Sequence, residues 1–384
     1  MSAPPQPHHA TILDGIYDIT TTEARQDCCN AFATAVQDHY PFLSKKSDKA
    51  AVDAVLASKD DIAPELYRAY ADNLRRAIDA VPLDNDDLQT QWHANVSRFA
   101  AYKAHTATQR IREANEEYGR EQADRLFRIF NRYQAAEYNT AVARARTGKQ
   151  WDTFMGDDNR RLFPSIQWLP SRSANPREEH MPFYYKIWAK DDPFWTTNFP
   201  GNLWNCKCDW EETDDDPTDD NPQGPAARPG LDLNPATSGQ IFTDTNLYVA
   251  KAPAGTQMAV NAFERNGFRQ RNKNANLKTK TEIGEVTISK RYFHEVAKSS
   301  IDSKGYWLKN EVAENINKYV SSFEYDGPEA IELSHNKKGT KTYNMKAKAK
   351  QMHVFKKRMF GYDFTYKVME FYNGNLMAYT LYIQ

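Results

Sequence analysis

The sequence predicts a multidomain fold: a mainly α-helical N-terminal region with a compact, tryptophan-rich α+β domain, then a C-terminal α+β domain whose helices pack on an antiparallel sheet. Three observations predict this fold. Apolar residues in the first part recur at helical spacing, six of the eight tryptophans lie between positions 151 and 210, and the last part changes from helical spacing to alternation. A chain of 384 residues is long enough for two or three domains.

Composition bears on the class of protein. A composition of 40% hydrophobic and 26% charged residues is typical of a globular protein. The net charge of −1 is not the strongly positive charge that is typical of proteins that bind nucleic acid. Four cysteines are too few for a disulfide scaffold, so we expect synthesis in a reducing compartment. The N-terminus lacks the basic and apolar parts of a signal peptide, and no apolar run approaches the length of a membrane span.

The N-terminal part is expected to be helical after a flexible tail over residues 1–20. The segment PELYRAYADNLRRAIDAV places its apolar residues at steps of three and four, as in an amphipathic helix. A proline-free stretch from 87 to 147 continues the helical pattern, with alternating charges on its outer faces. We expect Gly148 to end the helical region, because glycine is favoured just beyond a helix C-terminus.

A compact, irregular domain with an aromatic core is expected to follow, so that the helices and this domain together span 21–210. A linker is expected over 211–280, acidic in its first part and basic in its last. Residues 211–220 hold seven acidic side chains and no basic one, and like-charge repulsion keeps such a run extended. The run lacks the alternating spacing and central glycine of a calcium loop.

The C-terminal domain is expected over 281–384, beginning with a helix whose N-cap is Ser289. A second helix is expected in YWLKNEVAENINKYV. The segments YVSSFEY and AIELSH are predicted to form a hairpin around DGPE, and KTYNMKAK a third strand. Two more strands are predicted on either side of Asn373-Gly374, a favoured two-residue turn.

The last strand is predicted to have two different faces, because side chains alternate along a strand. The residues expected to meet the helices are Met377, Tyr379, Leu381 and Ile383. The residues expected on the open face of the sheet are Leu376, Ala378, Thr380 and Tyr382. On that open face, two hydroxyl groups would be available either for chemistry or simply for contact with solvent.

A basic stripe in the C-terminal domain indicates a polyanionic partner or a solvated surface. Residues 337–358 hold nine basic side chains and no acidic one. His294 and Lys298 are four residues apart and share one helix face. Metal-free RNA cleavage needs a proton acceptor, a proton donor and a cation near the phosphate, which histidine and lysine can supply. A metal-independent ribonuclease is therefore one hypothesis for this domain.

Cys206 and Cys208 leave three interpretations open: a metal site, a redox pair, or two buried thiols in an aromatic core. Zinc usually needs four ligands, and His180 or Asp209 could complete a site begun by the two thiols. A disulfide between residues so close in sequence is strained. Buried thiols are the simplest interpretation, and zinc is the one cofactor that the residues suggest.

One multi-residue pattern resembles a known family. It runs through NPREEHMPFYYKIWAKDDPFWTTNFPGNLWNCKC and contains an Arg, a His three residues later, DPFW, a Pro-Gly pair, and WNCKC. In this sequence the pattern comprises Arg177, His180, Asp192–Trp195, Pro200-Gly201 and Trp204–Cys208. Its order and spacing resemble the signature of the phage Mu F-like minor head proteins, the phage head morphogenesis family, with Lys207 where the family usually has Arg. The resemblance covers about 130–210.

That resemblance implies a structural protein made in the cytoplasm of a bacterial host and present in the virion, in the capsid interior or near the portal. Portal and capsid proteins would be its partners. It implies no enzyme activity for this part of the chain, and it leaves metal binding by His180 and the two cysteines open.

The C-terminal domain resembles the barnase–EndoU–colicin–RelE-like nucleases in its order of helices and strands. The resemblance implies RNA as substrate, an immunity protein as partner, and five candidate catalytic residues: His294, Lys298, Thr380, Tyr382 and, as a phosphate clamp, Arg358. Arg291 is an alternative to Lys298. The competing hypothesis is a purely structural virion protein whose C-terminal domain binds nucleic acid or capsid without catalysis.

Overall fold

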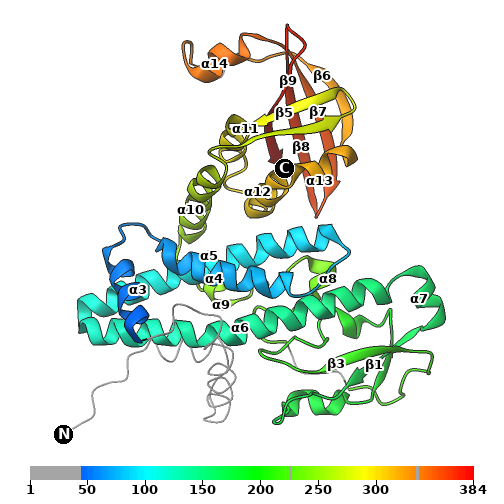
Figure 1. Cartoon of the computed structure of the whole chain (residues 1–384). Helices are drawn as coiled ribbons and strands as arrows, with labels where there is room; N and C mark the ends of the chain where they lie inside the picture. Colours follow the sequence, from blue (N-terminus) through cyan, green and yellow to red (C-terminus); the bar gives the residue numbers. More distant parts are fainter. Residues whose placement is uncertain (1–44, 223, 225–226, 334–336) are drawn as a thin grey trace. The chain divides into compact units, whose positions relative to one another are not determined.

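The computed structural model describes residues 45–222, 224, 227–333 and 337–384, so the predicted tail over 1–20 lies outside the described residues. The chain divides into two compact units, Met1–Ala254 and Gly255–Gln384 (Figure 1). The predicted fold class is confirmed: the first unit is mainly helical with a tryptophan-rich part, and the second packs helices on a sheet.

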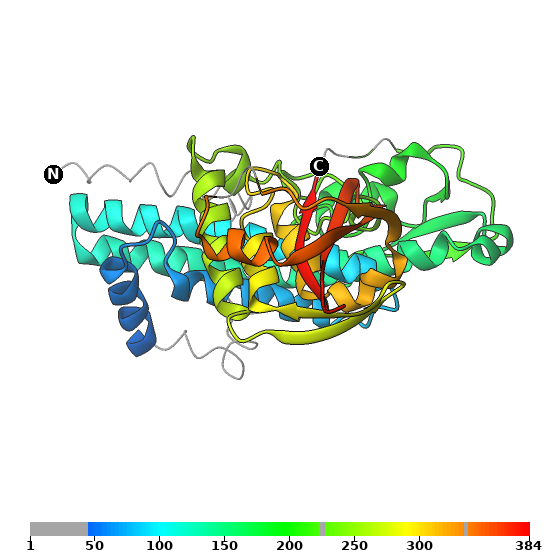
Figure 2. The ribbon, with the colours of Figure 1, turned by 90° about the horizontal axis from the view of Figure 1, so that it is seen from above.

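Helices form most of the first unit. Two long helices, α5 (Asp86–Tyr118) and α6 (Arg120–Phe154), lie side by side (Figures 1 and 2). Gly119 separates them with φ of +81°, a conformation that favours glycine. The other helices are α3 (Lys45–Ala57), α4 (Pro64–Asp79) and α7 (Asp157–Leu162).

Helix α4 confirms the prediction from apolar spacing. Its buried face includes Leu66, Tyr70, Leu74 and Ile78, each no more than 3% exposed. These residues pack against the two long helices, so the α4 stripe faces the core of the unit.

The predicted role of Gly148 is wrong, because α6 continues for six residues beyond it. A Cβ atom added at Gly148 would lie 2.6 Å from the Trp92 ring. Trp92 is fixed by a hydrogen bond from its indole N–H to the Pro235 carbonyl oxygen, 3.0 Å away. The glycine therefore allows close approach of the Trp92 ring to α6 and does not terminate the helix.

The tryptophan-rich part contains a three-stranded antiparallel sheet in the order β2-β1-β3. The strands are β1 (Ser165–Leu169), β2 (Ile187–Ala189) and β3 (Asp209–Thr213), with short 3-10 helices η1 (Glu178–Phe183) and η2 (Pro193–Thr196). Its core is aromatic as predicted, built mainly from Trp151, Phe154, Trp168, Phe183, Trp188, Trp195, Phe199 and Trp210.

The range 211–280, for which we expected a linker, contains several packed elements. It includes the end of β3, α8 (Pro235–Ser238), α9 (Leu247–Ala250), α10 (Thr256–Arg271) and β4 (Asn276–Thr281). Arg144 of α6 is fully buried and donates hydrogen bonds to five carbonyl groups, those of Gly201, Leu231, Leu233, Gln240 and Ile241. These bonds hold the irregular backbone around 231–241 on the helical core.

The second unit has a six-stranded sheet in the order β4-β5-β9-β8-β7-β6. Its remaining strands are β5 (Gly284–Ser289), β6 (Glu324–Glu329), β7 (Ala349–Met359), β8 (Tyr362–Phe371) and β9 (Leu376–Ile383). The sheet is mixed and not wholly antiparallel, because β5 and β9 pair in parallel.

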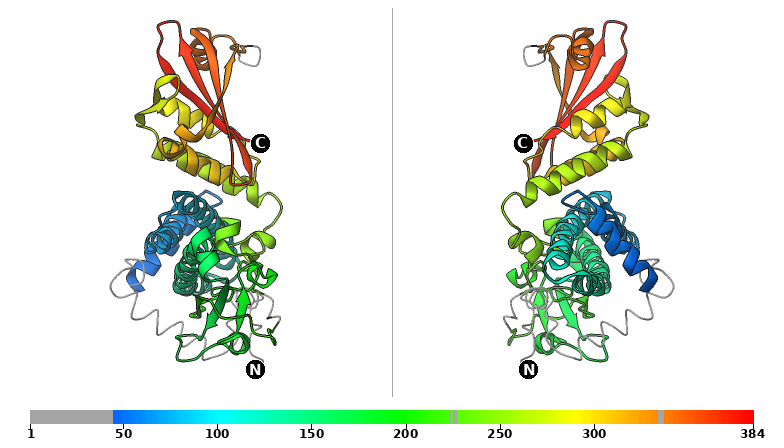
Figure 3. Two further views of the ribbon diagram at one scale, coloured as in Figure 1. Left: turned by 90° about the vertical axis from the view of Figure 1, so that its right-hand side faces the viewer. Right: turned by 90° about the vertical axis from the view of Figure 1, so that its left-hand side faces the viewer.

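Helices of the second unit pack on one face of this sheet (Figure 3). They are α10, α11 (Lys290–Val296), α12 (Tyr306–Glu314), α13 (Ile316–Tyr319) and the 3-10 turn η3 (Val320–Ser322). The short helix α14 (Lys341–Lys346) places Met345 in a smaller cluster with Met352, Met369, Met377 and Tyr379.

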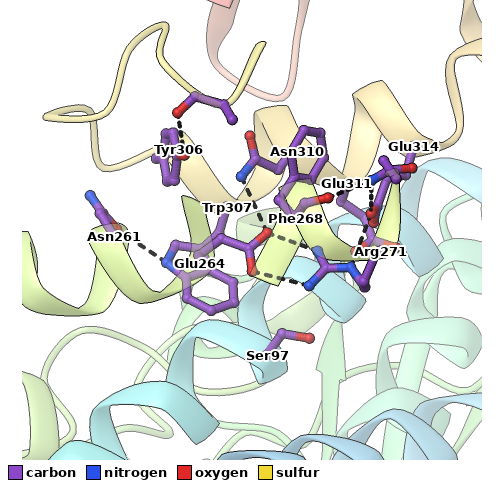
Figure 4. Close-up of polar contacts among 12 residues, drawn as sticks. Ser97, Asn261, Glu264, Phe268, Arg271, Tyr306, Trp307, Asn310, Glu311 and Glu314 are labelled. Carbon is purple, nitrogen blue, oxygen red and sulfur yellow. Dashed lines mark hydrogen bonds and ion pairs between the residues drawn. The ribbon is translucent and has the colours of Figure 1, made fainter. Parts of the chain in front are cut away.

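Polar contacts fix α10 to α12 (Figure 4). Glu264 of α10 is 2% exposed and accepts hydrogen bonds from Arg271 at 2.9 Å and from Asn310 of α12 at 3.2 Å. The Trp307 indole N–H donates to Asn261 at 3.1 Å. Because these buried groups satisfy one another, α10 is an integral part of the second unit.

Some predicted elements of the second unit are confirmed. Ser289 caps α11, with its hydroxyl accepting a hydrogen bond from the Arg291 backbone N–H. The second predicted helix is present as α12 and α13. The turn at Asn373-Gly374 joins β8 to β9, and Gly374 has φ of +80°.

Two predicted strand assignments are wrong. DGPE is not a hairpin turn but lies within β6, where an edge strand tolerates Pro328 and the register shifts at Gly327. Residues 319–322 are helical, and 330–333 form no strand; 334–335, the end of AIELSH, lie outside the described residues. KTYNMKAK forms α14 for most of its length, because Thr340 caps a helix there by accepting from the Tyr343 N–H.

The predicted faces of β9 are correct only beyond a bulge. Val368 pairs with Ala378 and Lys367 with Thr380, so Tyr379 is an extra residue on β9. Leu381 and Ile383 lie in the helix-covered core as predicted. The bulge reverses the faces before it: Leu376 and Ala378 meet that core, and Met377 and Tyr379 join the smaller cluster.

Candidate metal centre

His180, Cys206 and Cys208 converge within the tryptophan-rich part of the first unit. His180 lies in η1, and the two cysteines lie in the loop that leads into β3. Asn205 turns this loop with φ of +57°, a conformation that asparagine tolerates better than most residues. The turn brings both cysteines back toward η1.

The three side chains are close enough to share one ion. The His180 Nδ1 atom lies 3.4 Å from each cysteine Sγ. All three potential ligand atoms lie within 4.8 Å of one another. His180 is 1% exposed and Cys206 is 7% exposed, so most of the cluster is shielded from water. Within the described residues, no other His, Cys, Asp or Glu joins this group.

The imidazole of His180 is oriented by its neighbours. Its Nε2 atom lies 2.8 Å from the Asn202 Oδ1 atom, and the Asn202 amide in turn donates to the Thr197 carbonyl oxygen at 3.1 Å. Since Oδ1 can only accept, Nε2 carries the proton and Nδ1 has its lone pair facing the thiols. The Trp168 ring meets the imidazole edge-on at 5.0 Å. Metal-binding histidines usually donate their other ring N–H to such a fixed acceptor, which sets the tautomer and the ring orientation.

Each of the two thiols changes the pKa of the other. The hydrogen bond from Cys208 lowers the pKa of Cys206 well below its ordinary value, against the opposing effect of burial. The same hydrogen bond raises the pKa of Cys208, because its ionisation would place two thiolates side by side. A divalent cation removes this conflict by binding both thiolates, so two sulfurs and one imidazole nitrogen fit zinc.

Additional donors surround the Cys208 sulfur. The Trp168 indole and the Tyr184 hydroxyl both favour its ionised form. An anionic sulfur would accept from such donors. Both cysteines are free thiols in this structure.

In the second unit, the structure brings only some of the predicted catalytic residues together. His294 is exposed on α11, whereas Lys298 is exposed in the turn that follows this helix, so the two do not share a helix face as predicted. The pKa of His294 is lowered, first by partial burial and then by the charges of Lys298 and Arg269. Arg291 also acts on His294, and its guanidinium donates to the Thr342 hydroxyl at 2.7 Å.

Thr380, Tyr382 and Arg358 lie elsewhere. Thr380 and Tyr382 alternate with Leu381 and Ile383, so they lie on the sheet face opposite the core that α11 covers. Arg358 forms an ion pair with Asp363, in which its Nη1 atom donates to both carboxylate oxygens at 2.8 and 2.9 Å. His294 therefore has the cations of α10 and α11 near it, but not the hydroxyls of β9.

Sequence reasoning missed several residues near these sites. Asn202 orients His180, but its spacing carries no recognisable signal. Arg269 was assigned to the expected linker, although the apolar spacing of Val260, Phe268 and their neighbours would have indicated a helix there. His353 lies within the basic stripe of residues 337–358, whose composition gives no sign of its contacts. Its ring bonds Tyr325 at 2.8 Å and Glu370 at 3.0 Å, contacts that depend on strand pairing.

Comparisons with known proteins give one partial match. The protein named "Putative capsid assembly protein F" of Escherichia phage Mu is 36% identical over 47 residues, which is 12% of this chain and 11% of the phage Mu protein. The matched segment thus spans about a tenth of that relative's length. No protein-family model matches the chain, and no solved structure matches it. In the described part of the chain, no helix is long and apolar enough to cross a membrane.

Proposed function

We propose that this chain is a minor structural protein of a phage head, and that it acts in head assembly. The observation that carries the proposal is the 36% identity with a capsid assembly protein of phage Mu. The signature residues of the predicted family support it, because His180, Cys206 and Cys208 form one buried cluster and Trp195 lies in the core beside it. The proposed location is the virion, in the capsid interior or near the portal, and the proposed partners are portal and capsid proteins.

The proposed task of the metal centre is structural. Zinc held by His180, Cys206 and Cys208 would tie η1 to the loop before β3, and so fix the tryptophan-rich part as one rigid surface for a partner. Three protein ligands leave a fourth position for water or for a group from a partner. Structural zinc contributes directly to folding, so the tryptophan-rich part would depend on it.

Purified phage heads provide the test of the head-assembly proposal. Mass spectrometry of heads from a phage that encodes this chain should detect it at low copy number. A Cys206→Ser/Cys208→Ser variant should be depleted from heads, whereas a His294→Ala variant should be incorporated normally. If heads form and package DNA equally well after deletion of the gene, a role in head assembly is excluded.

A second candidate function, metal-independent RNA cleavage, belongs to the C-terminal unit. The observation that favours it is the position of His294 among Lys298, Arg269 and Arg291. Partial burial, and then the charges of these cations, lower the pKa of His294 and keep it available as a proton acceptor near neutral pH. Those cations would stabilise the charge that develops on a phosphodiester. An immunity protein would be expected to cover this face of α10 and α11.

Cleavage of total RNA by the full-length protein in EDTA tests this second function. The wild-type protein and a Lys304→Ala control should cleave equally, because Lys304 is exposed and lies outside the cluster. His294→Ala should lose at least about a hundredfold in rate, as expected for loss of a general base. Salt-sensitive RNA binding without cleavage would instead support a C-terminal domain that only binds nucleic acid.

A further inference from the structure

A cavity of about 710 Å³ lies beside the metal centre and is not explained by metal binding. It lies entirely within the first unit. One wall is the α6 face that carries Tyr138, Val142 and Arg146, and the opposite wall is the loop 205–209, which includes both cysteines. Its volume is typical of a site that encloses a small molecule or a few residues of a peptide.

The charge of the cavity is positive. Its lining contains Arg146, Lys149, Arg172 and Lys207, against Asp209 as the one acidic lining residue. Arg172 is paired with Asp209 at 2.9 Å, and Lys149 donates to a backbone carbonyl. In the described part of the chain, Arg146 and Lys207 are exposed and form no ion pair. Two cations thus remain available to a ligand.

The remaining lining favours an extended peptide as that ligand. Ala80, Val142 and Ala143 supply apolar contact, and Asn139, Asn205 and Gln150 supply amides that can bond a peptide backbone. A nucleic acid duplex is a convex rod, and it cannot enter a cavity of this volume. The combination of apolar wall, amides and free cations therefore matches an acidic polypeptide segment.

The chain itself carries a segment with this chemistry. Residues 211–220 contain seven acidic side chains and no basic one. Asp214, Asp216, Asp219 and Asp220 are exposed, and no ion pair engages them among the described residues. None of them lines the cavity of its own copy. These aspartates follow strand β3, which begins at Asp209 at the cavity edge. The strand extends by roughly 3.3 Å per residue and so carries them away from that edge.

Strand β3 holds residues 211–213, and Glu212 is paired with Lys190. We propose that the acidic segment that follows, 214–220, binds in the basic cavity of a second copy. The contact joins two different surfaces, so each copy offers one acidic segment and one cavity. Such head-to-tail contacts build rings or open chains and not closed two-fold dimers. Repeated contacts of this kind would arrange the copies in a ring or a short arc.

Light scattering on two complementary full-length variants tests this contact. Arg146→Glu/Lys207→Glu disables the cavity and keeps the acidic segment. Asp214→Lys/Asp216→Lys disables the acidic segment and keeps the cavity. Wild type should grow beyond a dimer as its concentration rises at low salt. Each variant alone should stay monomeric, with its dissociation constant raised by about a hundredfold or more, because like charges would oppose each other.

An equimolar mixture of the two variants gives the decisive result. The intact cavity of one variant can then receive the intact acidic segment of the other, and the two reversed surfaces also carry opposite charges, so the mixture should regain the association that each variant lacks alone. Circular dichroism of each variant should match wild type. The proposal is overturned if wild type stays monomeric at every concentration, if Arg146→Glu/Lys207→Glu associates like wild type, or if the mixture associates no more than either variant alone. The proposal is likewise overturned if Arg146→Glu/Lys207→Glu loses binding to duplex DNA while no sample self-associates. That result would assign the cavity to nucleic acid.

Discussion

At the scale of single residues, Asn202 is the orienting partner of the candidate metal centre. Replacing Asn202 with Ala removes the acceptor of the His180 Nε2 proton. Loss of such a partner typically weakens metal binding by ten- to a hundredfold. We therefore expect Asn202→Ala to lower zinc affinity by about that factor in competition with a chromophoric chelator.

The neighbouring Asn198 provides a matched control for this substitution. It is also buried in the tryptophan-rich part, but it bonds Thr197 and not the imidazole. Asn198→Ala should leave zinc affinity within a few-fold of wild type. Equal losses in the two variants would show that general destabilisation, and not the orientation of His180, controls binding.

Glu370 predicts a pH effect in the second unit. Hydrogen bonds from Lys350, His353 and Gln351 lower the pKa of Glu370 to about 2. A carboxyl with a depressed pKa in the folded state contributes stability above its usual pKa of about 4.5, and that contribution is lost as the pH falls toward 2. Carboxyl ¹³C NMR should show Glu370 titrating near pH 2, and Lys350→Ala should move its pKa upward. A midpoint near 4.5 in wild type would contradict the network.

The sequence was sufficient to select His180, Cys206 and Cys208 as one group, because a multi-residue pattern connected them. It was not sufficient for Asn202 or Arg269, whose roles depend on which side chains folding places beside them. The same limit applies to Thr380 and Tyr382, which were grouped with His294 although β9 presents them on the other side of the sheet.

At the scale of elements, α6 and α10 offer a matched pair of helical glycines. A Cβ at Gly148 would meet the fixed Trp92 ring at 2.6 Å, whereas a Cβ at Gly267 would lie 3.3 Å from the Arg271 Nη1 atom, a milder approach that a shift of a few tenths of an ångström relieves. Alanine has the higher helix propensity at both positions. Gly148→Ala should nevertheless destabilise the protein by about 1–3 kcal/mol through overpacking, while Gly267→Ala should be neutral or stabilising by up to about 1 kcal/mol.

Thermal or urea unfolding of the two variants measures this difference. Trp92→Phe combined with Gly148→Ala should recover part of the loss, because the smaller ring leaves room for the new methyl group. If Gly148→Ala proves as stable as wild type, the close packing of α5 on α6 is not as the structure has it.

Elements were predictable where local signals were strong. Apolar spacing identified α4, Ser289 identified the start of α11, and Asn373-Gly374 identified the last hairpin. The predicted strands were wrong where a single residue changed the local backbone structure. Tyr379 forms a bulge that reverses part of β9, and Thr340 caps a helix in a segment whose alternation suggested a strand. A bulge adds no sequence signal when the residues on both sides of it are apolar.

At the scale of the whole molecule, the chain has two units with separate cores. Calorimetry should therefore resolve two unfolding transitions. Because the candidate zinc ligands all lie in the first unit, chelation by EDTA should lower the midpoint of one transition and leave the other unchanged. The unaffected transition acts as an internal control. Equal shifts of both transitions, or no shift of either, would contradict a structural metal confined to the first unit.

The expected linker over 211–280 shows why domain boundaries were hard to predict. Acidic and asparagine-rich composition is typical of flexible segments, but burial depends on partners that are distant in sequence. Arg144 supplies hydrogen bonds to the backbone around 231–241, and Glu264 connects α10 to α12. Neither contact can be recognised from composition.

Zinc-edge X-ray absorption of the purified full-length protein tests the metal centre most directly, and with it the proposal that a metal organises the head-assembly part. We predict about one zinc per chain, with two sulfur ligands near 2.3 Å and nitrogen near 2.0–2.1 Å. The sulfur signal should disappear in Cys206→Ser/Cys208→Ser. Absence of stoichiometric zinc, or a shell of oxygen and nitrogen alone, would contradict the account.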